Sequence, residues 1–168
     1  MSIQIGNQPS TFTTRDGKEV VKYRLRRNDK HLLVKASDSY VFAPRDSKSS
    51  CMITKDVSFI NAINKICERI YLDQELPVKR PFVLKDQSTD QFVCFPYWSP
   101  YAKLNIDNVV SYSNEMNLKH NISGDVLLRI TDFTIKDGSI YLNMAYYSIK
   151  GTQAIVNSVD IDSFVNEF

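Results

Sequence analysis

The sequence is poor in the residues that mark a disulfide framework, a metal cluster or a phosphate-binding loop. Five glycines leave little room for a glycine-rich loop that cradles phosphates. Three cysteines, Cys51, Cys67 and Cys94, are odd in number and widely spaced, which argues against a regular disulfide framework or a closed zinc site. Two histidines, His31 and His120, fit no metal-binding motif. We therefore predict no metal and no other cofactor.

Long apolar runs are also missing. No stretch approaches the roughly 18–20 apolar residues that a membrane-spanning helix needs. Residues 1–10 are polar and lack the charged lead and apolar block of a secretory signal. We expect an intracellular protein without a membrane partner.

What is present indicates a folded chain. The 168 residues are 43% hydrophobic and 11% aromatic, which is too apolar for a disordered segment and long enough to bury one core. The net charge of +2 conceals an asymmetry. Residues 15–35 hold eight basic and three acidic side chains, whereas residues 151–168 hold three acids and no base. This distribution is typical of a polyanion-binding body with an acidic interaction tail, and also of a solvated strand face followed by an ordinary polar terminus.

Hydrophobic periodicity predicts mostly strands. Residues 20–27 alternate in the manner of a half-buried strand, and a turn at 28–30 leads to strands at 31–36 and 39–43. Residues 56–72 carry one apolar stripe at helical spacing, with Thr54 or Asp56 as the N-cap. Cys67 lies on that stripe and is expected to be core.

The second half continues as short strands. Four of the six prolines lie in residues 76–100, which excludes a long helix there and favours strands at 81–85 and 91–95. A further apolar piece spans 106–112. Residues 125–133 and 139–149 flank Asp137-Gly138, the strongest short-range signature of a hairpin. We predict a mostly β (α+β) protein: a five-stranded antiparallel OB-like barrel with one mid-chain helix, spanning residues 1–150.

Residues 92–101 read F-V-C-F-P-Y-W-S-P-Y, an aromatic run held extended by proline. Bases of single-stranded nucleic acid stack on such rings, and phosphates pair with nearby cations. The alternative is that the rings fill the core. The candidate binding residues of this region are Lys79, Arg80, Tyr97, Trp98, Tyr101 and Lys103.

Other strands repeat the combination of cations and rings. Lys22, Arg24 and Arg26 would share one face of their strand, while Arg129 and Tyr141 lie on the two strands of the last hairpin. An OB barrel binds oligonucleotides on such a face. A charged face that discourages edge-to-edge aggregation is the alternative for each residue.

The end of the chain resembles the OB-fold single-stranded DNA-binding proteins of phages and large DNA viruses. The resemblance covers residues 124–151, where a glycine-led strand, the Asp137-Gly138 turn and an apolar strand follow one another. The tail, residues 151–168, resembles the acidic tail with a terminal aromatic that many replication proteins of this kind carry. In this chain the tail residues are Asp160, Asp162, Glu167 and Phe168.

The resemblance implies a viral protein of the host cytoplasm or nucleus that coats single-stranded DNA in replication or recombination, without catalysis and without sequence specificity. It also implies that the tail docks replication proteins, and a homo-oligomer is compatible with it. Two alternatives stay open. One is a protein-interaction or structural viral accessory module, with residues 92–101 as its anchor. The other is a metal-dependent nuclease whose scattered acids, Asp107, Asp125 and Asp132, meet in one site.

Overall fold

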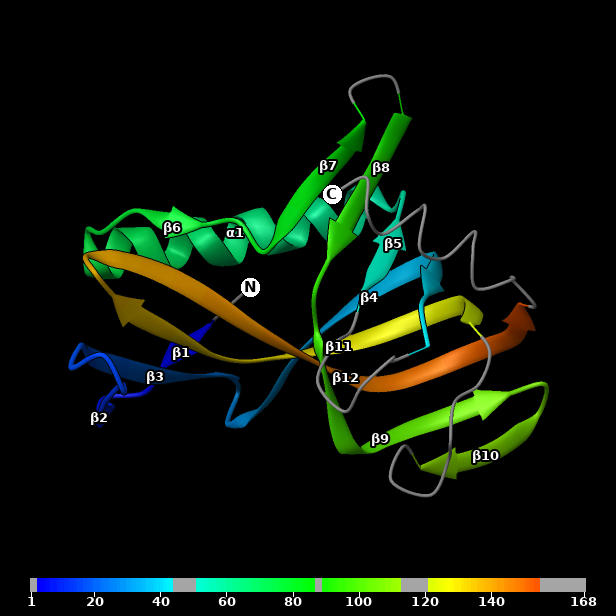
Figure 1. Ribbon diagram of the computed structural model, residues 1–168, viewed down its shortest axis with the longest axis horizontal. Coiled ribbons are helices and arrows are strands. Elements are labelled where there is room, and N and C mark those ends of the chain that lie inside the picture. The colour runs from blue at the N-terminus through cyan, green and yellow to red at the C-terminus, as the bar shows by residue number, and fades with distance from the viewer. Residues whose placement is uncertain (1–2, 44–50, 87–88, 113–120, 155–168) are drawn as a thin grey trace.

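The computed structural model describes residues 3–43, 51–86, 89–112 and 121–154. These residues form a mostly β structure with one helix, so the expected α+β class is confirmed. No helix among them is long and apolar enough to cross a membrane. The strands join in one open, mixed sheet in the order β10-β9-β12-β11-β3-β4-β5-β8-β7, and β1, β2 and β6 pair at its sides (Figure 1).

The prediction of a closed five-stranded barrel is wrong. Twelve strands form the sheet, and its path ends at β10 and β7 without closing. Two pairings are parallel, β12 with β9 and β12 with β6, whereas an antiparallel barrel was expected. Alternation along a strand reveals which residues face the core, but it carries no information about which strand will be the neighbour.

Two long strands, β11 (Asn121–Lys136) and β12 (Ser139–Ala154), form the centre of the sheet. They are the expected hairpin, and the turn between them has positive φ at Asp137 (53°) and Gly138 (73°), as a two-residue hairpin turn requires. β11 is long enough to pair with β3 through residues 132–135 and with β4 through residues 122–130. Figure 1 shows both strands running through the whole molecule.

The N-terminal strands flank this hairpin. β3 (Glu19–Arg27) and β4 (Lys30–Val41) meet at a turn where Asn28 and Asp29 have positive φ. The expected strands 31–36 and 39–43 are therefore largely one strand, β4. β1 (Gln4–Ile5) and β2 (Ser10–Thr13) both pair with β3.

The remaining strands follow α1 in the chain, apart from β5 (Met52–Thr54), which pairs with β4 and β8. β7 (Phe82–Asp86) and β8 (Thr89–Cys94) form the expected hairpin. β6 (Val78–Lys79) pairs with β12. The expected single piece 106–112 is divided by a turn at Asp107 and Asn108, which have positive φ and connect β9 (Tyr97–Ile106) to β10 (Val109–Tyr112).

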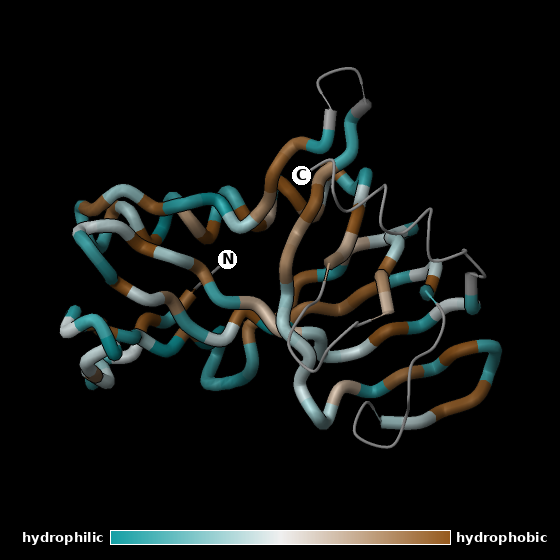
Figure 2. The backbone as a smooth tube through the Cα atoms, viewed as in Figure 1, coloured by the Kyte–Doolittle hydropathy of each residue, from teal (hydrophilic) through white to brown (hydrophobic). Residues whose placement is uncertain are grey.

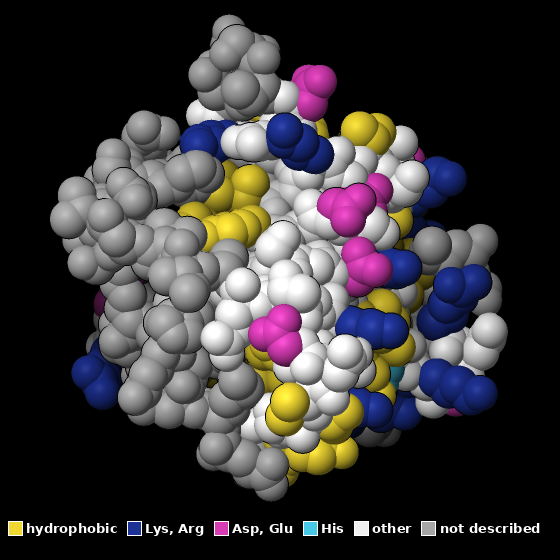
Figure 3. Space-filling model, turned by 90° about the vertical axis from the view of Figure 1, so that its right-hand side faces the viewer, with side chains coloured by type: hydrophobic (Ala, Val, Ile, Leu, Met, Phe, Trp, Pro, Cys, Tyr) yellow, Lys and Arg dark blue, Asp and Glu magenta, His cyan; other side chains and the backbone are white. Residues whose placement is uncertain are grey.

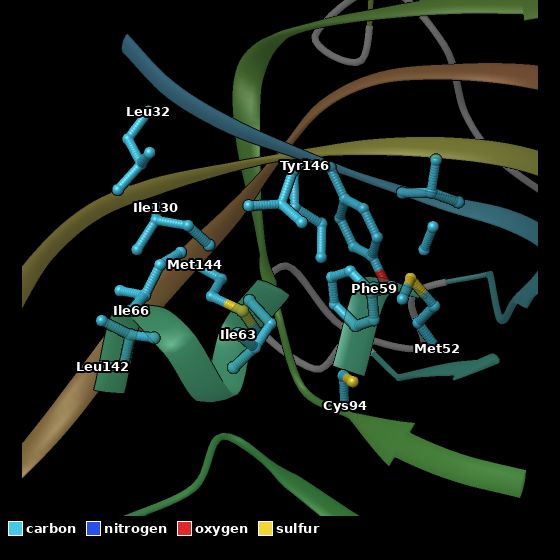
Figure 4. Packing of buried hydrophobic residues seen from close by; sticks show 14 of the residues in the cluster. Leu32, Met52, Phe59, Ile63, Ile66, Cys94, Ile130, Leu142, Met144 and Tyr146 are labelled. Atoms are coloured by element: carbon cyan, nitrogen blue, oxygen red, sulfur yellow. The ribbon is translucent and has the colours of Figure 1, made fainter. Parts of the chain in front are cut away.

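The helix α1 (Val57–Gln74) confirms the expected element. Asp56 is its N-cap, because the carboxylate accepts a hydrogen bond from the backbone N–H of Phe59 at 3.2 Å. Figure 4 shows Phe59, Ile63 and Ile66 directed at residues of the sheet, Tyr146 among them. Cys67 is buried on the same stripe, and burial raises its thiol pKa, which suits packing. Figure 2 shows that hydrophobic and hydrophilic residues follow one another along the strands of the sheet.

Candidate nucleic-acid interface

The sheet has a second face, turned away from α1. Leu128 and Ile130 of β11 and Met144 of β12 belong to the core beneath the helix. Side chains alternate along a strand, so Arg129 and Ala145, which lie between core residues, point to the opposite side. We call this side the outer face.

Strand register places the cation Arg129 beside an aromatic ring on the outer face. Arg129 pairs with Leu33 of β4 on one side and with Ala145 of β12 on the other. Ala145 in turn pairs with Tyr97 of β9. Residues that pair directly project to the same side, so Arg129 and Tyr97 flank the small side chain of Ala145. The Tyr97 hydroxyl donates a hydrogen bond to Thr131 Oγ1 at 3.3 Å.

Two further rows carry the basic residues of β3. Arg24 pairs with Asp132, whose carboxylate accepts a hydrogen bond from the Asn143 amide. The next row crosses four strands. Thr134 of β11 lies between Lys22 of β3 and Tyr141 of β12, and Tyr141 pairs on its other side with Lys79 of β6. Lys22, Tyr141 and Lys79 come from three distant parts of the chain. The register nevertheless brings them onto one line across the outer face.

His31 connects the aromatic part of the outer face to the basic part. It pairs with Arg26 at the start of β4, and its ring meets the Tyr147 ring edge-on, with centroids 5.8 Å apart. The pKa of His31 is lowered, first by burial of the ring and then by the positive charges of Arg129 and Arg26. His31 therefore binds a proton less readily than an ordinary histidine does.

A bulge in β9 exposes an aromatic side chain. Trp98 of β9 pairs with Tyr146 of β12, and the next pair is Lys103 with Ser148. Over this interval β9 advances by five residues while β12 advances by two. Pro100 and Tyr101 of this bulge are exposed while Ala102 is buried, and proline suits a segment that leaves the ladder. Tyr101 in this bulge is 77% exposed. Such exposure is unusual for a large ring and leaves its face available for stacking.

Two hollows on the outer face, among those in the described part of the chain, differ in their chemistry. The first, of about 290 Å³, is lined mainly by rings together with one guanidinium. We call it the ring pocket; among its lining residues are His31, Tyr97, Trp98, Tyr101, Arg129 and Tyr147. The second, of about 710 Å³, lies between β3 and residues 4–10. We call it the β3 cleft; its charged lining residues are Lys22, Arg24, Arg26, Asp29 and Asp132.

Charge pairing distinguishes Arg129 from several other cations. Lys18 and Lys35 lie 2.9 Å and 3.7 Å from the carboxylates of Asp137 and Asp125. Arg129 is only partly exposed, yet in the described part of the chain it makes no ion pair and no hydrogen bond. A partly buried cation in this situation favours a negatively charged or acceptor-rich ligand. Figure 3 shows Lys and Arg side chains interspersed with hydrophobic ones on the right-hand part of that view.

Most of the residues expected from the sequence lie on the outer face. Lys22, Arg24 and Arg26 line the β3 cleft, whereas Tyr97, Trp98, Tyr101 and Arg129 line the ring pocket. Lys79 and Tyr141 lie in the row of Lys22, as described above. Lys103 lies one row beyond the ring pocket, where it pairs with Ser148.

Three expectations fare differently. Arg80 lies beside Cys67 of α1, where its charge opposes the rise in the thiol pKa, so it is not gathered with the others. Trp98 packs on Tyr146 at 4.4 Å between ring centroids and is partly core. Residues 151–154 of the expected tail continue β12, and Asp160, Asp162, Glu167 and Phe168 lie outside the described residues.

Sequence reasoning missed His31 and Thr131 as parts of this surface. His31 was considered only as a metal ligand, although its place directly after the β3–β4 turn puts it opposite Arg26. That register was a readable signal, because a two-residue turn fixes which residues face one another. The contribution of residues 4–10 to the β3 cleft left no signal in the sequence.

The acids proposed for a nuclease site do not come together. Asp107 and Asp125 line one hollow of about 530 Å³, and Asp132 lines the β3 cleft. Across the described residues, no group of three or more His, Cys, Asp or Glu side chains is arranged to hold a metal ion.

Comparison of the chain with protein-family models, with curated protein sequences and with solved structures gave no match.

Proposed function

We propose that the protein binds single-stranded DNA on the outer face, without catalysis and without strict sequence specificity. The observation that carries the proposal is the strand register, which brings Arg24, Arg26 and Arg129 onto one open surface with Tyr97; the β9 bulge adds Tyr101 to the ring pocket there. Flat rings beside unpaired cations are the combination that an unpaired polynucleotide requires, because bases stack on the rings and phosphates contact the cations.

The two hollows divide these tasks. The β3 cleft carries three cations against the carboxylates of Asp29 and Asp132 and is otherwise lined largely by polar residues, so its excess of positive charge suits the phosphate backbone. Successive outward residues of a strand are about 6.6 Å apart, so Lys22, Arg24 and Arg26 form a regular line of positive charge along the cleft. The ring pocket then receives a base from the same strand, since Arg26 and His31 join the two hollows.

The proposal includes a role in DNA replication or recombination. The acidic tail residues would dock replication proteins, and the chain would act inside a cell, as a viral protein would in its host. These points rest on the resemblance described above and on the acidic composition of residues 151–168.

The first experiment measures the salt dependence of binding to fluorescein-labelled oligo-dT by anisotropy. Each phosphate contact contributes about 0.7 to the slope of log K against log salt for a single strand. We expect Arg24→Ala and Arg26→Ala each to reduce that slope by about one contact. Arg69→Ala on α1 is the matched control and should leave it unchanged, because Arg69 lies on the opposite side of the sheet and pairs with Asp73.

Two results would contradict the proposal. One is the absence of oligo-dT binding at low salt by the full-length wild-type protein. The other is binding that the Arg24 and Arg26 variants leave unchanged in both affinity and salt slope. Capture of a protein partner in high salt, together with either result, would favour the interaction-module alternative. Magnesium-dependent cleavage of the oligonucleotide would favour the nuclease.

A second experiment tests stacking. Replacing Tyr101 by Ala should weaken oligo-dT binding by about 1–3 kcal/mol without lowering the melting temperature, because the ring is exposed and supports no core contact. Tyr71→Ala is the matched control: Tyr71 is 54% exposed, but on α1. Equal effects of the two substitutions would show that Tyr101 does not stack on a base.

A further inference from the structure

The ring pocket differs from the β3 cleft in a way that bears on base selection. The cleft offers several cations and no aromatic ring, whereas the pocket offers one guanidinium surrounded by rings. A strand that lies along both hollows therefore presents different groups to each. The phosphates fit the cleft, and a base fits between rings. The volume of the pocket, about 290 Å³, suits a single base rather than a larger group.

Arg129 is one of the residues that line this pocket. It lies on the central strand β11, between Leu33 and Ala145, and it is only partly exposed. Ala145 is the smallest side chain in its row and leaves space between Arg129 and Tyr97. The guanidinium can therefore approach the edge of a base whose face rests on a tyrosine ring.

The hydrogen-bonding capacity of the pocket is biased toward donors. A guanidinium carries five N–H donors and no acceptor. The Arg129 donors have no protein acceptor within the described chain. The neighbouring side chains of His31 and Arg26 carry no negative charge that could neutralise the guanidinium. The indole Nε1–H of Trp98 is buried and adds nothing to this set, so the donors of the set are those of Arg129. A base with two adjacent acceptors on one edge complements this arrangement best.

We propose that the ring pocket is a base-selective subsite in which Arg129 donates two hydrogen bonds to O6 and N7 of a guanine. Guanine offers the acceptors O6 and N7 side by side on its Hoogsteen edge, whereas adenine replaces O6 by an amino group. The inference rests on the proposed function and adds a preference at one position of the bound strand. The remaining positions stay unselective, because their bases meet no such set of donors.

The test separates this subsite from general strand binding. The probes are labelled abasic decamers that carry a single base, either guanine, hypoxanthine, 7-deazaguanine or adenine, at a central position. Hypoxanthine keeps O6 and N7, 7-deazaguanine lacks N7, and adenine lacks O6. We expect wild-type protein to bind the guanine and hypoxanthine probes alike. Both should bind roughly 5- to 150-fold more tightly than the adenine probe, the range that a bidentate arginine–guanine pair provides.

Substitution of Arg129 completes the test. Arg129→Lys keeps the charge but removes the two-pronged geometry, so the preference for guanine should fall to nearly one while oligo-dT binding persists. Arg69→Lys on α1 is the matched control and should retain the full preference. Melting temperatures of both variants establish that each is folded.

Four outcomes decide between the possibilities. The inference is supported if Arg129→Lys loses the preference for guanine while the control Arg69→Lys retains it. Wild-type protein that binds oligo-dT but binds all four single-base probes equally overturns the inference and leaves the proposed function intact. Wild-type protein that binds no oligonucleotide overturns both. If Arg129→Met weakens every probe by the same factor and reduces the salt slope, Arg129 contacts a phosphate and the base-selective role is wrong.

Discussion

His31 occupies a position where a proton is disfavoured. Its ring is desolvated, and Arg129 and Arg26 repel a positive charge, so its pKa in the folded protein lies below that in the unfolded chain. The unfolded chain therefore binds more protons than the folded one as pH falls through the pKa of an ordinary histidine. By linkage, the free energy of unfolding rises with pH across that window and decreases toward acid.

His31→Gln should flatten this dependence. We expect the melting temperature of the wild type to fall further than that of the variant between pH 7.5 and about 5.5. This is the window in which an ordinary histidine titrates. Measurement by differential scanning calorimetry in the two buffers gives the difference directly. His120 is present in both proteins, so its contribution cancels. Parallel pH profiles for the two proteins would contradict the placement of His31 beside the two arginines.

At the scale of elements, β11 and β12 lie close together where Gly124 pairs with Gly151. A Cβ atom added to Gly124 would lie 2.2 Å from the carbonyl oxygen of Lys150, and one added to Gly151 would lie 2.2 Å from that of Ser123. Both obstacles are backbone, which cannot move aside as a side chain can.

Gly124→Ala and Gly151→Ala should therefore each destabilise the protein by about 1–3 kcal/mol, because the two strands must separate. Gly6→Ala is the matched control, since its added Cβ would meet the Arg24 carbonyl oxygen at an ordinary 3.5 Å. Urea unfolding followed by circular dichroism measures all three. An unchanged midpoint in the Gly124 or Gly151 variant would show that the strands are farther apart than described.

Local elements were readable from the sequence because their causes are local. The helix follows from its apolar stripe and the Asp56 cap, and the central hairpin follows from Asp137-Gly138. The Asp107-Asn108 turn was overlooked, because both residues adopt positive φ without a glycine. Neighbouring residues in sequence determine a turn, whereas the parallel pairing of β9 with β12 joins segments about 50 residues apart, which no local pattern specifies.

The candidate site was predictable to a similar extent. The alternation in residues 20–27 placed Lys22, Arg24 and Arg26 on one side of a strand, where the structure has them. Their proximity to Tyr97 and Arg129 depends on the register of three neighbouring strands, so composition suggested the ingredients without their arrangement. Whether aromatic residues 92–101 are core or surface also depended on the β9 bulge, which exposes Tyr101 while Trp98 packs inward.

At the scale of the whole molecule, stability should decline from the centre of the sheet to its edges. β11 is paired on both sides along most of its length, whereas β10 is paired only with β9. We expect backbone amides of β11 to exchange with deuterium most slowly and those of β10 to exchange fastest among the strands described, because an edge opens without disrupting the core. Hydrogen–deuterium exchange with mass spectrometry measures this gradient. Protection of β10 equal to that of β11 at high protein concentration, lost on dilution, would indicate that a second copy covers this edge.

The parallel pairing of β9 with β12 affects the order in which the strands can pair while the chain is being synthesised. Both β6 and β9 leave the ribosome before β12, yet each takes β12 as a neighbour, and β11 also depends on it for one whole side. During translation these segments must wait with unsatisfied main-chain groups, since contacts between distant parts of a chain form slowly. Completion of β12 is therefore the event that allows the sheet, and with it the outer face, to assemble.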